Sequence, residues 1–201
     1  MSDLPLHKTT SLFLYQKVNK DTVYSMDVKT PVKSAIVTYK LAMPQDSNPA
    51  PGTDLLERAN INGGSILHLI DNTCGIAALR HCRTRVVTAS IDRMEFLNPV
   101  KVGDLIIVKA SVNWVGRTSM EVGCRVEVED LFTGEVKQVG RAYLTFVAIN
   151  EEGRPINAPP IKPESEDEER RYEQAQDRRK GRLAHRELMM QKYDHKVGFD
   201  Q

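Results

Sequence analysis

The stretch that decides the fold reads ANINGGSILHLID from Ala59 to Asp71 and continues with NTCGIAALRHC. After a pair of glycines, apolar residues recur every three or four positions, which is the period of an amphipathic helix. These residues are Ile66, Leu67, Ile70, Cys74, Ala77 and Ala78. The spacing predicts a helix over 64–81, with a length of about 27 Å at about 1.5 Å per residue.

Asp71 is the unusual residue of this helix, because it falls on or beside the apolar face. It comes four positions after Leu67 and three before Cys74. A carboxylate in a core is costly unless it is hydrogen-bonded or protonated. Two interpretations stay open at this point. Either Asp71 caps a neighbouring segment or pairs with Arg80 or Arg93, or it belongs to a reactive site.

The start of the same helix offers a second chemical feature. Gly63 and Gly64 allow a ligand to approach the backbone closely. The first N–H groups of a helix have no internal partner, and the helix dipole favours an anion or a polarised carbonyl there. This end and Asp71 are two turns apart, about 11 Å, too far to serve one reacting atom. A symmetric dimer would bring Asp71 of one subunit near the glycines of the other.

Strand patterns flank the helix on both sides. They cover Ser34–Pro44, Arg85–Leu97, Asp104–Gly116, Thr118–Leu131 and Glu135–Ile149. Short turns between the last strands indicate antiparallel neighbours. One helix against a five-stranded antiparallel sheet is an α+β layer architecture. We therefore predict an N-terminal arm over 1–32, a central domain over 33–161 and a charged helical tail over 162–201, with a loop over 45–54.

Composition limits the classes of function. The chain has 201 residues, 40% of them hydrophobic and 27% charged, with a net charge of +1. No overall field favours nucleic acid or an acidic membrane, and no apolar run approaches the roughly 20 residues needed to insert into a bilayer. The cysteines Cys74, Cys82 and Cys124 are odd in number and lack metal-ligand spacing, so we expect reduced thiols in a cytoplasmic protein.

Several pieces of the chain, taken in order, resemble one family. They are MPQDSN, NGGSILHLID, ALRHC, VVTASID, FLNPVKVGD, TSMEV and RAYLTFVAINEEGRP, followed by the tail EDEERRYEQAQDRRKGRLAHR. Over about Val37 to Glu187 the chain resembles the hotdog-fold acyl-CoA thioesterases, in the group related to brain-type cytosolic acyl-CoA hydrolase and its single-domain bacterial relatives.

The resemblance implies a hotdog fold, an antiparallel five-stranded sheet wrapped around one long central helix, here with a charged C-terminal helix. It implies hydrolysis of acyl-CoA to a free carboxylic acid and coenzyme A, as in fatty acid metabolism. No metal and no cofactor is expected, since coenzyme A is part of the substrate and product. The implied self-association is a dimer, assembled further into a trimer of dimers, that is a hexamer.

The resemblance also implies site residues. Asp71 matches the family's catalytic aspartate, and PQDSN places its asparagine at Asn48 on the opposite subunit. The backbone of Gly63 and Gly64 polarises the thioester carbonyl. Water activated by Asp71 then attacks, although direct attack by the carboxylate to form an anhydride stays open.

One departure concerns the asparagine. In the family it stands a few residues before the glycine pair, whereas PAPGTDLLERANI here adds several residues after Asn48. The insertion either loops out and leaves Asn48 in place or brings Asn60 or Asn62 to the site. The flanking motif favours Asn48. A spoiled loop is also the best support for the alternative function, a non-catalytic hotdog module that binds or senses acyl-CoA.

The residues that bind coenzyme A are the hardest to predict from the sequence. Phosphates favour cations near exposed N–H groups. The turn GRTS contains Arg117, Thr118 and Ser119 and resembles the family's nucleotide-contacting region, although a plain hairpin turn is the simpler interpretation. VVTAS, which contains Thr88, is implied to lie beside the pantetheine arm.

Overall fold

The computed structural model describes residues 26–48, 59–92 and 94–193. Most of the predicted arm, much of the predicted loop, Arg93 and the last eight residues lie outside this description. The elements are α1 (Pro31–Ser34), β1 (Ile36–Leu41), the 3-10 turn η1 (Pro44–Asp46), α2 (Gly63–Cys82), β2 (Arg85–Ile91), β3 (Glu95–Phe96), β4 (Leu105–Val115), β5 (Ser119–Glu129), β6 (Val136–Ile149) and α3 (Glu166–Tyr193).

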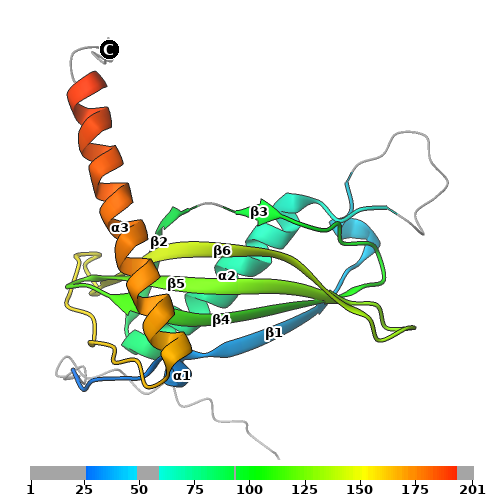
Figure 1. The fold of residues 1–201 in the computed structure, drawn as a ribbon, viewed down its shortest axis with the longest axis horizontal. Coiled ribbons are helices and arrows are strands. Elements are labelled where there is room, and N and C mark those ends of the chain that lie inside the picture. The colour runs from blue at the N-terminus through cyan, green and yellow to red at the C-terminus, as the bar shows by residue number, and fades with distance from the viewer. Residues whose placement is uncertain (1–25, 49–58, 93, 194–201) are drawn as a thin grey trace, which may run out of the picture.

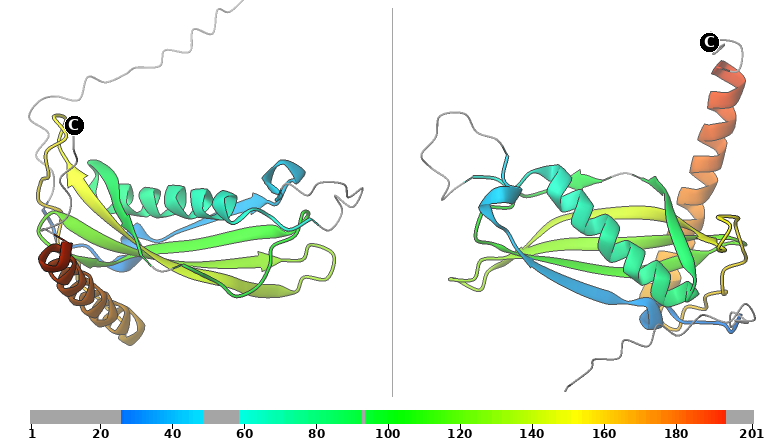
Figure 2. Two further views of the ribbon diagram at one scale, coloured as in Figure 1. Left: turned by 90° about the horizontal axis from the view of Figure 1, so that it is seen from above. Right: turned by 180° about the vertical axis from the view of Figure 1, so that it is seen from behind.

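One antiparallel sheet and one long helix form the body of the molecule, as predicted. The strands follow the order β1-β4-β5-β6-β2. The sheet curves around α2, and α3 crosses the opposite face (Figures 1 and 2). The single strand predicted over Arg85–Leu97 is wrong in one respect. The chain leaves the ladder after Ile91 and rejoins it at Glu95, so β2 and β3 both pair with β6 and the described sheet has six strands.

The long helix α2 begins and ends at recognisable caps. At its start the Asn62 side chain accepts a hydrogen bond from the Gly64 N–H at 2.7 Å. It ends at Arg83, whose φ of 57° is left-handed. The Lys29 ammonium donates to the carbonyl of His81 in the last turn, where a cation complements the helix dipole. The observed helix is two residues longer than the predicted one.

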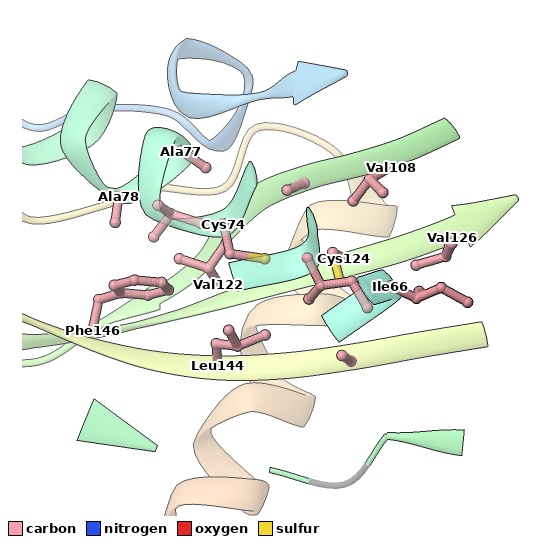
Figure 3. Close-up of a cluster of buried hydrophobic side chains, with 14 of the residues drawn as sticks. Ile66, Cys74, Ala77, Ala78, Val108, Val122, Cys124, Val126, Leu144 and Phe146 are labelled. Carbon is pink, nitrogen blue, oxygen red and sulfur yellow. The ribbon is translucent and has the colours of Figure 1, made fainter. Parts of the chain in front are cut away.

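The core fills the space between α2 and the concave face of the sheet. Figure 3 shows the helix side chains of Ile66 and Cys74 facing strand side chains such as Val122 and Leu144. The three cysteines are free and buried, as the sequence indicates. Burial raises the pKa of the Cys82 thiol to about 12. Among the described residues, no helix is long and apolar enough to cross a bilayer.

Candidate active site

Asp71 lies at the border of the core rather than within it. The helix residues Ile70 and Cys74 are fully buried, whereas Asp71 is half-buried and faces β2. Its carboxylate accepts a hydrogen bond from the Thr88 hydroxyl at 2.8 Å. The sequence left the partner of Asp71 open, with Arg80 as one candidate. The structure shows Thr88 of β2 in that position. Arg93 is outside the described residues.

The strand that carries Thr88 is an edge strand of the described sheet. β2 pairs with β6 on one side, and its register shifts between Thr88 and Ser90. Edge strands present unpaired backbone groups that favour pairing with another chain. Val87 and Ile91 of β2 are both more than 40% exposed, as are Ile76 and Leu79 of α2. The carboxylate of Asp71 therefore lies close to an uncovered, partly apolar edge.

The glycine pair forms the second part of the site. Because the Gly64 N–H donates to Asn62, its donor capacity is already used. The Gly63 N–H has no acceptor among the residues that the structure describes. A Cβ at Gly63 would come 3.4 Å from the ring of Phe96. A pocket of about 340 Å³ opens beside Gly63, between the start of α2 and the segment Phe96–Val100.

The PQDSN motif is fixed by local hydrogen bonds. Asp46 accepts from the Lys40 ammonium at 2.8 Å and from the Met43 N–H at 3.3 Å. The bond from Lys40 is the main reason why the pKa of Asp46 is lowered. Ser47 donates its hydroxyl to the Pro44 carbonyl at 2.6 Å. These contacts orient the chain that leads into Asn48.

The insertion begins and ends at one place. The Asn48 N–H donates to the Asn60 carbonyl at 2.9 Å, and the Asn62 N–H donates to the Asp46 carbonyl at 2.8 Å. Residues on either side of 49–58 are therefore paired antiparallel, as the Ser47–Ile61 bridge also indicates. All three candidate asparagines lie near the start of α2. Of these, Asn62 is the helix cap, while Asn48 and Asn60 are exposed.

The candidate coenzyme residues do not lie together. Arg117 and Thr118 form the turn between β4 and β5, and the Arg117 side chain is exposed. Ser119 pairs across β6 with the row of Val87, whereas Thr88 is in the row of Phe146 and Met120. Neighbouring residues of a strand point to opposite faces. The sheet therefore directs Ser119 away from the face that carries Thr88 and Asp71.

Two features of the site were missed by the sequence. Thr88 was expected beside the pantetheine arm, but its hydrogen bond to Asp71 depends on how β2 lies against α2. Phe96 was part of a predicted strand with no role, yet its ring lies over Gly63. In the sequence, the signals for these contacts are Gly63 at the start of the helix and the polar residues of IDRME before Phe96.

A long helix held by a curved antiparallel sheet, with a carboxylate in its third turn, defines a hotdog protein of the thioesterase class. The model of the Thioesterase superfamily matches residues 59–135. YkhA of Bacillus subtilis, an uncharacterised acyl-CoA thioester hydrolase, is 37% identical over 136 residues, which is 68% of this chain and 74% of that one. The cytosolic acyl coenzyme A thioester hydrolase of Rattus norvegicus is 33% identical over 59% of this chain and 32% of its own.

Solved structures of acyl-CoA hydrolases are similar to this chain as well. An acyl-CoA hydrolase of Staphylococcus aureus, in complex with butyryl coenzyme A and coenzyme A, superimposes with a TM-score of 0.73 at 32% identity, covering 84% of this chain and 98% of that one. Structures exist for its variants with an asparagine, an aspartate or a threonine replaced by alanine. A hexameric acyl-CoA thioesterase gives 0.71 at 34% identity, covering 79% and 97%. The chain belongs to the thioesterase superfamily, among the hotdog acyl-CoA thioester hydrolases.

Proposed function

We propose that the protein hydrolyses acyl-CoA to a carboxylic acid and coenzyme A at a site shared by two subunits. The observation that carries this proposal is the contact of Asp71 with Thr88 beside the open edge of β2. The Staphylococcus aureus hydrolase supports it, since its replaced aspartate and threonine are 17 positions apart, as are Asp71 and Thr88. We include in the proposal a cytoplasmic location, in keeping with the name of the rat relative.

In the proposed reaction Asp71 acts as the general base. It removes a proton from water, and the resulting hydroxide adds to the thioester carbonyl. The oxyanion that forms is held by the Gly63 N–H at the positive end of α2. Collapse of this intermediate breaks the C–S bond and releases coenzyme A as the thiolate, which then takes up a proton. Thr88 holds the carboxylate in place. The anhydride route is the alternative for the first step.

The asparagine of the pair is assigned to Asn48. In the Staphylococcus aureus hydrolase the replaced asparagine precedes the aspartate by 15 positions, whereas Asn48 precedes Asp71 by 23. The difference of eight residues fits within 49–58. The pairing of Asn48 with Asn60 supports the assignment, because it brings together the residues on either side of that segment. Asn62 caps α2 and Asn60 remains the other candidate.

The proposal requires two subunits because Gly63 and Asp71 of one chain are too far apart to act on the same thioester. Gly63 and Asp71 are eight residues apart on one helix, or about 12 Å. Pairing of two β2 edges around a two-fold axis would cover Val87 and Ile91 and bring each Asp71 toward the other subunit. A trimer of such dimers is in keeping with the hexameric thioesterase of the same fold.

The test is thiol release from short, medium and long acyl-CoAs. We expect the wild-type protein to release free thiol, and Asp71→Asn to lower kcat by about a hundredfold or more, the usual contribution of a general base. Asn72→Ala is the matched control, since Asn72 is the exposed next residue of α2 and its side chain bonds to His68 on the same helix. Tight binding of acyl-CoA without thiol release would contradict the proposed activity. A normal kcat in Asp71→Asn would contradict the choice of base.

A further inference from the structure

The charged tail of the sequence has an anchoring residue in the sheet. Glu121 of β5 is 1% exposed and lies on the face opposite α2. Its carboxylate accepts from Arg178 of α3, from Nε at 3.1 Å and from Nη2 at 2.7 Å. The Arg178 guanidinium also lies 3.6 Å above the ring of Tyr143. A buried carboxylate is unfavourable unless it is paired, so this contact fixes where α3 crosses the sheet.

One helical turn later, Arg182 contacts a different part of the chain. Residues four apart share a helix face, so Arg182 points to the sheet as Arg178 does. Its guanidinium is ion-paired with Asp92 and lies 3.7 Å from Glu121. Asp92 is also held from the sheet side, because its N–H donates to the Tyr143 carbonyl at 2.8 Å. The Arg182 and Asp92 side chains are 29% and 14% exposed.

Asp92 lies in the link between β2 and β3, halfway between two residues of the candidate site. Thr88, four positions earlier, is hydrogen-bonded to Asp71. Phe96, four positions later, lies over Gly63. The regular ladder with β6 is interrupted between Ile91 and Glu95, where the described backbone bond to β6 is the one from Asp92 to Tyr143. The ion pair to α3 therefore adds a second contact at the point where the ladder is interrupted.

We propose that Arg182 of the C-terminal helix is a positioning residue, which acts through Asp92 to set Thr88 and Phe96 against the two halves of the active site. The inference rests on the proposed function of that site. It gives α3 a role in turnover beyond that of a solvated surface helix. A small displacement of a positioned group lowers the rate of reaction without changing the groups that react.

A double-mutant cycle tests the proposal in the full-length protein. Arg182→Gln and Asp92→Asn each break the ion pair with little change in size. We expect each to lower kcat about tenfold with a smaller change in KM, and the double variant to be no slower than either single one. Arg182→Lys should restore part of kcat. Lys180→Gln is the control, because Lys180 pairs with Asp177 on the same helix and both side chains are 75% exposed.

Three results would overturn the proposal. The first is a wild-type kcat in both single variants, and the second is losses that simply add in the double variant. The third is a loss that follows the fraction of folded protein, measured by circular dichroism and thermal unfolding. If the wild-type protein releases no thiol, the proposed function fails by itself. Hydrogen exchange over 85–97 then tests the positioning role of Arg182 by itself. Faster exchange in Arg182→Gln supports this role, and unchanged exchange refutes it.

Discussion

His81 is a buried titratable side chain outside the proposed reaction. It lies in the last turn of α2, fully buried, with Nε2 at 2.7 Å from the Pro159 carbonyl. Its Nδ1 has no hydrogen-bond partner among the described residues. Burial lowers the pKa of His81 below its ordinary value of 6.5, because the charged ring would lose its hydration. At the scale of single residues, this histidine makes the fold sensitive to acid.

We predict that acid destabilises the protein through His81. Below the unfolded-state pKa of 6.5 the unfolded chain binds a proton that the folded chain does not. The free energy of unfolding therefore decreases as the pH is lowered. Its slope is up to about 1.4 kcal/mol per pH unit. Urea unfolding between about pH 7.5 and 5.5 should show a steeper loss for the wild type than for His81→Gln. Equal slopes would exclude His81 as the cause.

The turn between β4 and β5 is the element to which the sequence assigned the coenzyme. It is pinned by two bonds, from the Gly116 N–H to the Ser119 carbonyl at 2.7 Å and from the Ala158 N–H to the Arg117 carbonyl at 2.9 Å. The backbone is therefore held while the Arg117 side chain is exposed. A cation on a fixed turn suits a phosphate contact, because the backbone loses little conformational entropy when the phosphate binds.

We predict that Arg117→Gln weakens substrate binding and leaves the chemical step unchanged. KM for acyl-CoA should rise about three- to tenfold at constant kcat, since the phosphates are remote from the thioester. Lys137→Gln is the control, as this lysine is a similarly exposed cation that pairs with Glu135 beside the next turn of the sheet. Steady-state kinetics with one acyl-CoA at low salt suffices. An unchanged KM would mean that a cation other than Arg117 binds the phosphates.

At the scale of the whole molecule, the proposed mechanism divides the site into two parts that one chain does not bring together. The asparagines and Gly63 lie at the start of α2, while Asp71 lies two turns further along and faces the β2 edge. A two-fold axis at that edge would join one half from each subunit. In the proposed arrangement the active site depends on assembly, so dilution to monomers should abolish the activity.

Subunit mixing tests this arrangement. Asp71→Asn and Asn48→Ala are each expected to be inactive, but a dimer with one chain of each kind contains one intact site and one doubly altered site. Unfolding and refolding an equal mixture should therefore recover about a quarter of wild-type activity, because half of the dimers are mixed. Separate refolding of each variant is the control. No recovery would mean that Asp71 and Asn48 act in the same chain. Recovery with Asn60→Ala instead of Asn48→Ala would assign the catalytic asparagine to Asn60.

Local patterns predicted most of the elements. The three- and four-residue spacing gave α2 to within two residues, and alternation with short turns gave β4, β5 and β6. The strand over Arg85–Leu97 was not predicted as two, because the break after Ile91 depends on contacts of Asp92 with β6 and α3. Nothing local in the sequence distinguishes Arg182 from its neighbouring cations on α3 either, since its partner Asp92 is 90 residues away.

The sequence by itself determined the helix, the class of sheet and the presence of a carboxylate on that helix, because these depend on periodicity and on residues close together in the chain. The tertiary structure decided which groups meet: Thr88 with Asp71, Phe96 with Gly63, Asn48 with Asn60, and Arg182 with Asp92. Such pairs depend on strand order and register, which bring distant segments together. Spacing along one chain does not encode that information in a form that can be read without the fold.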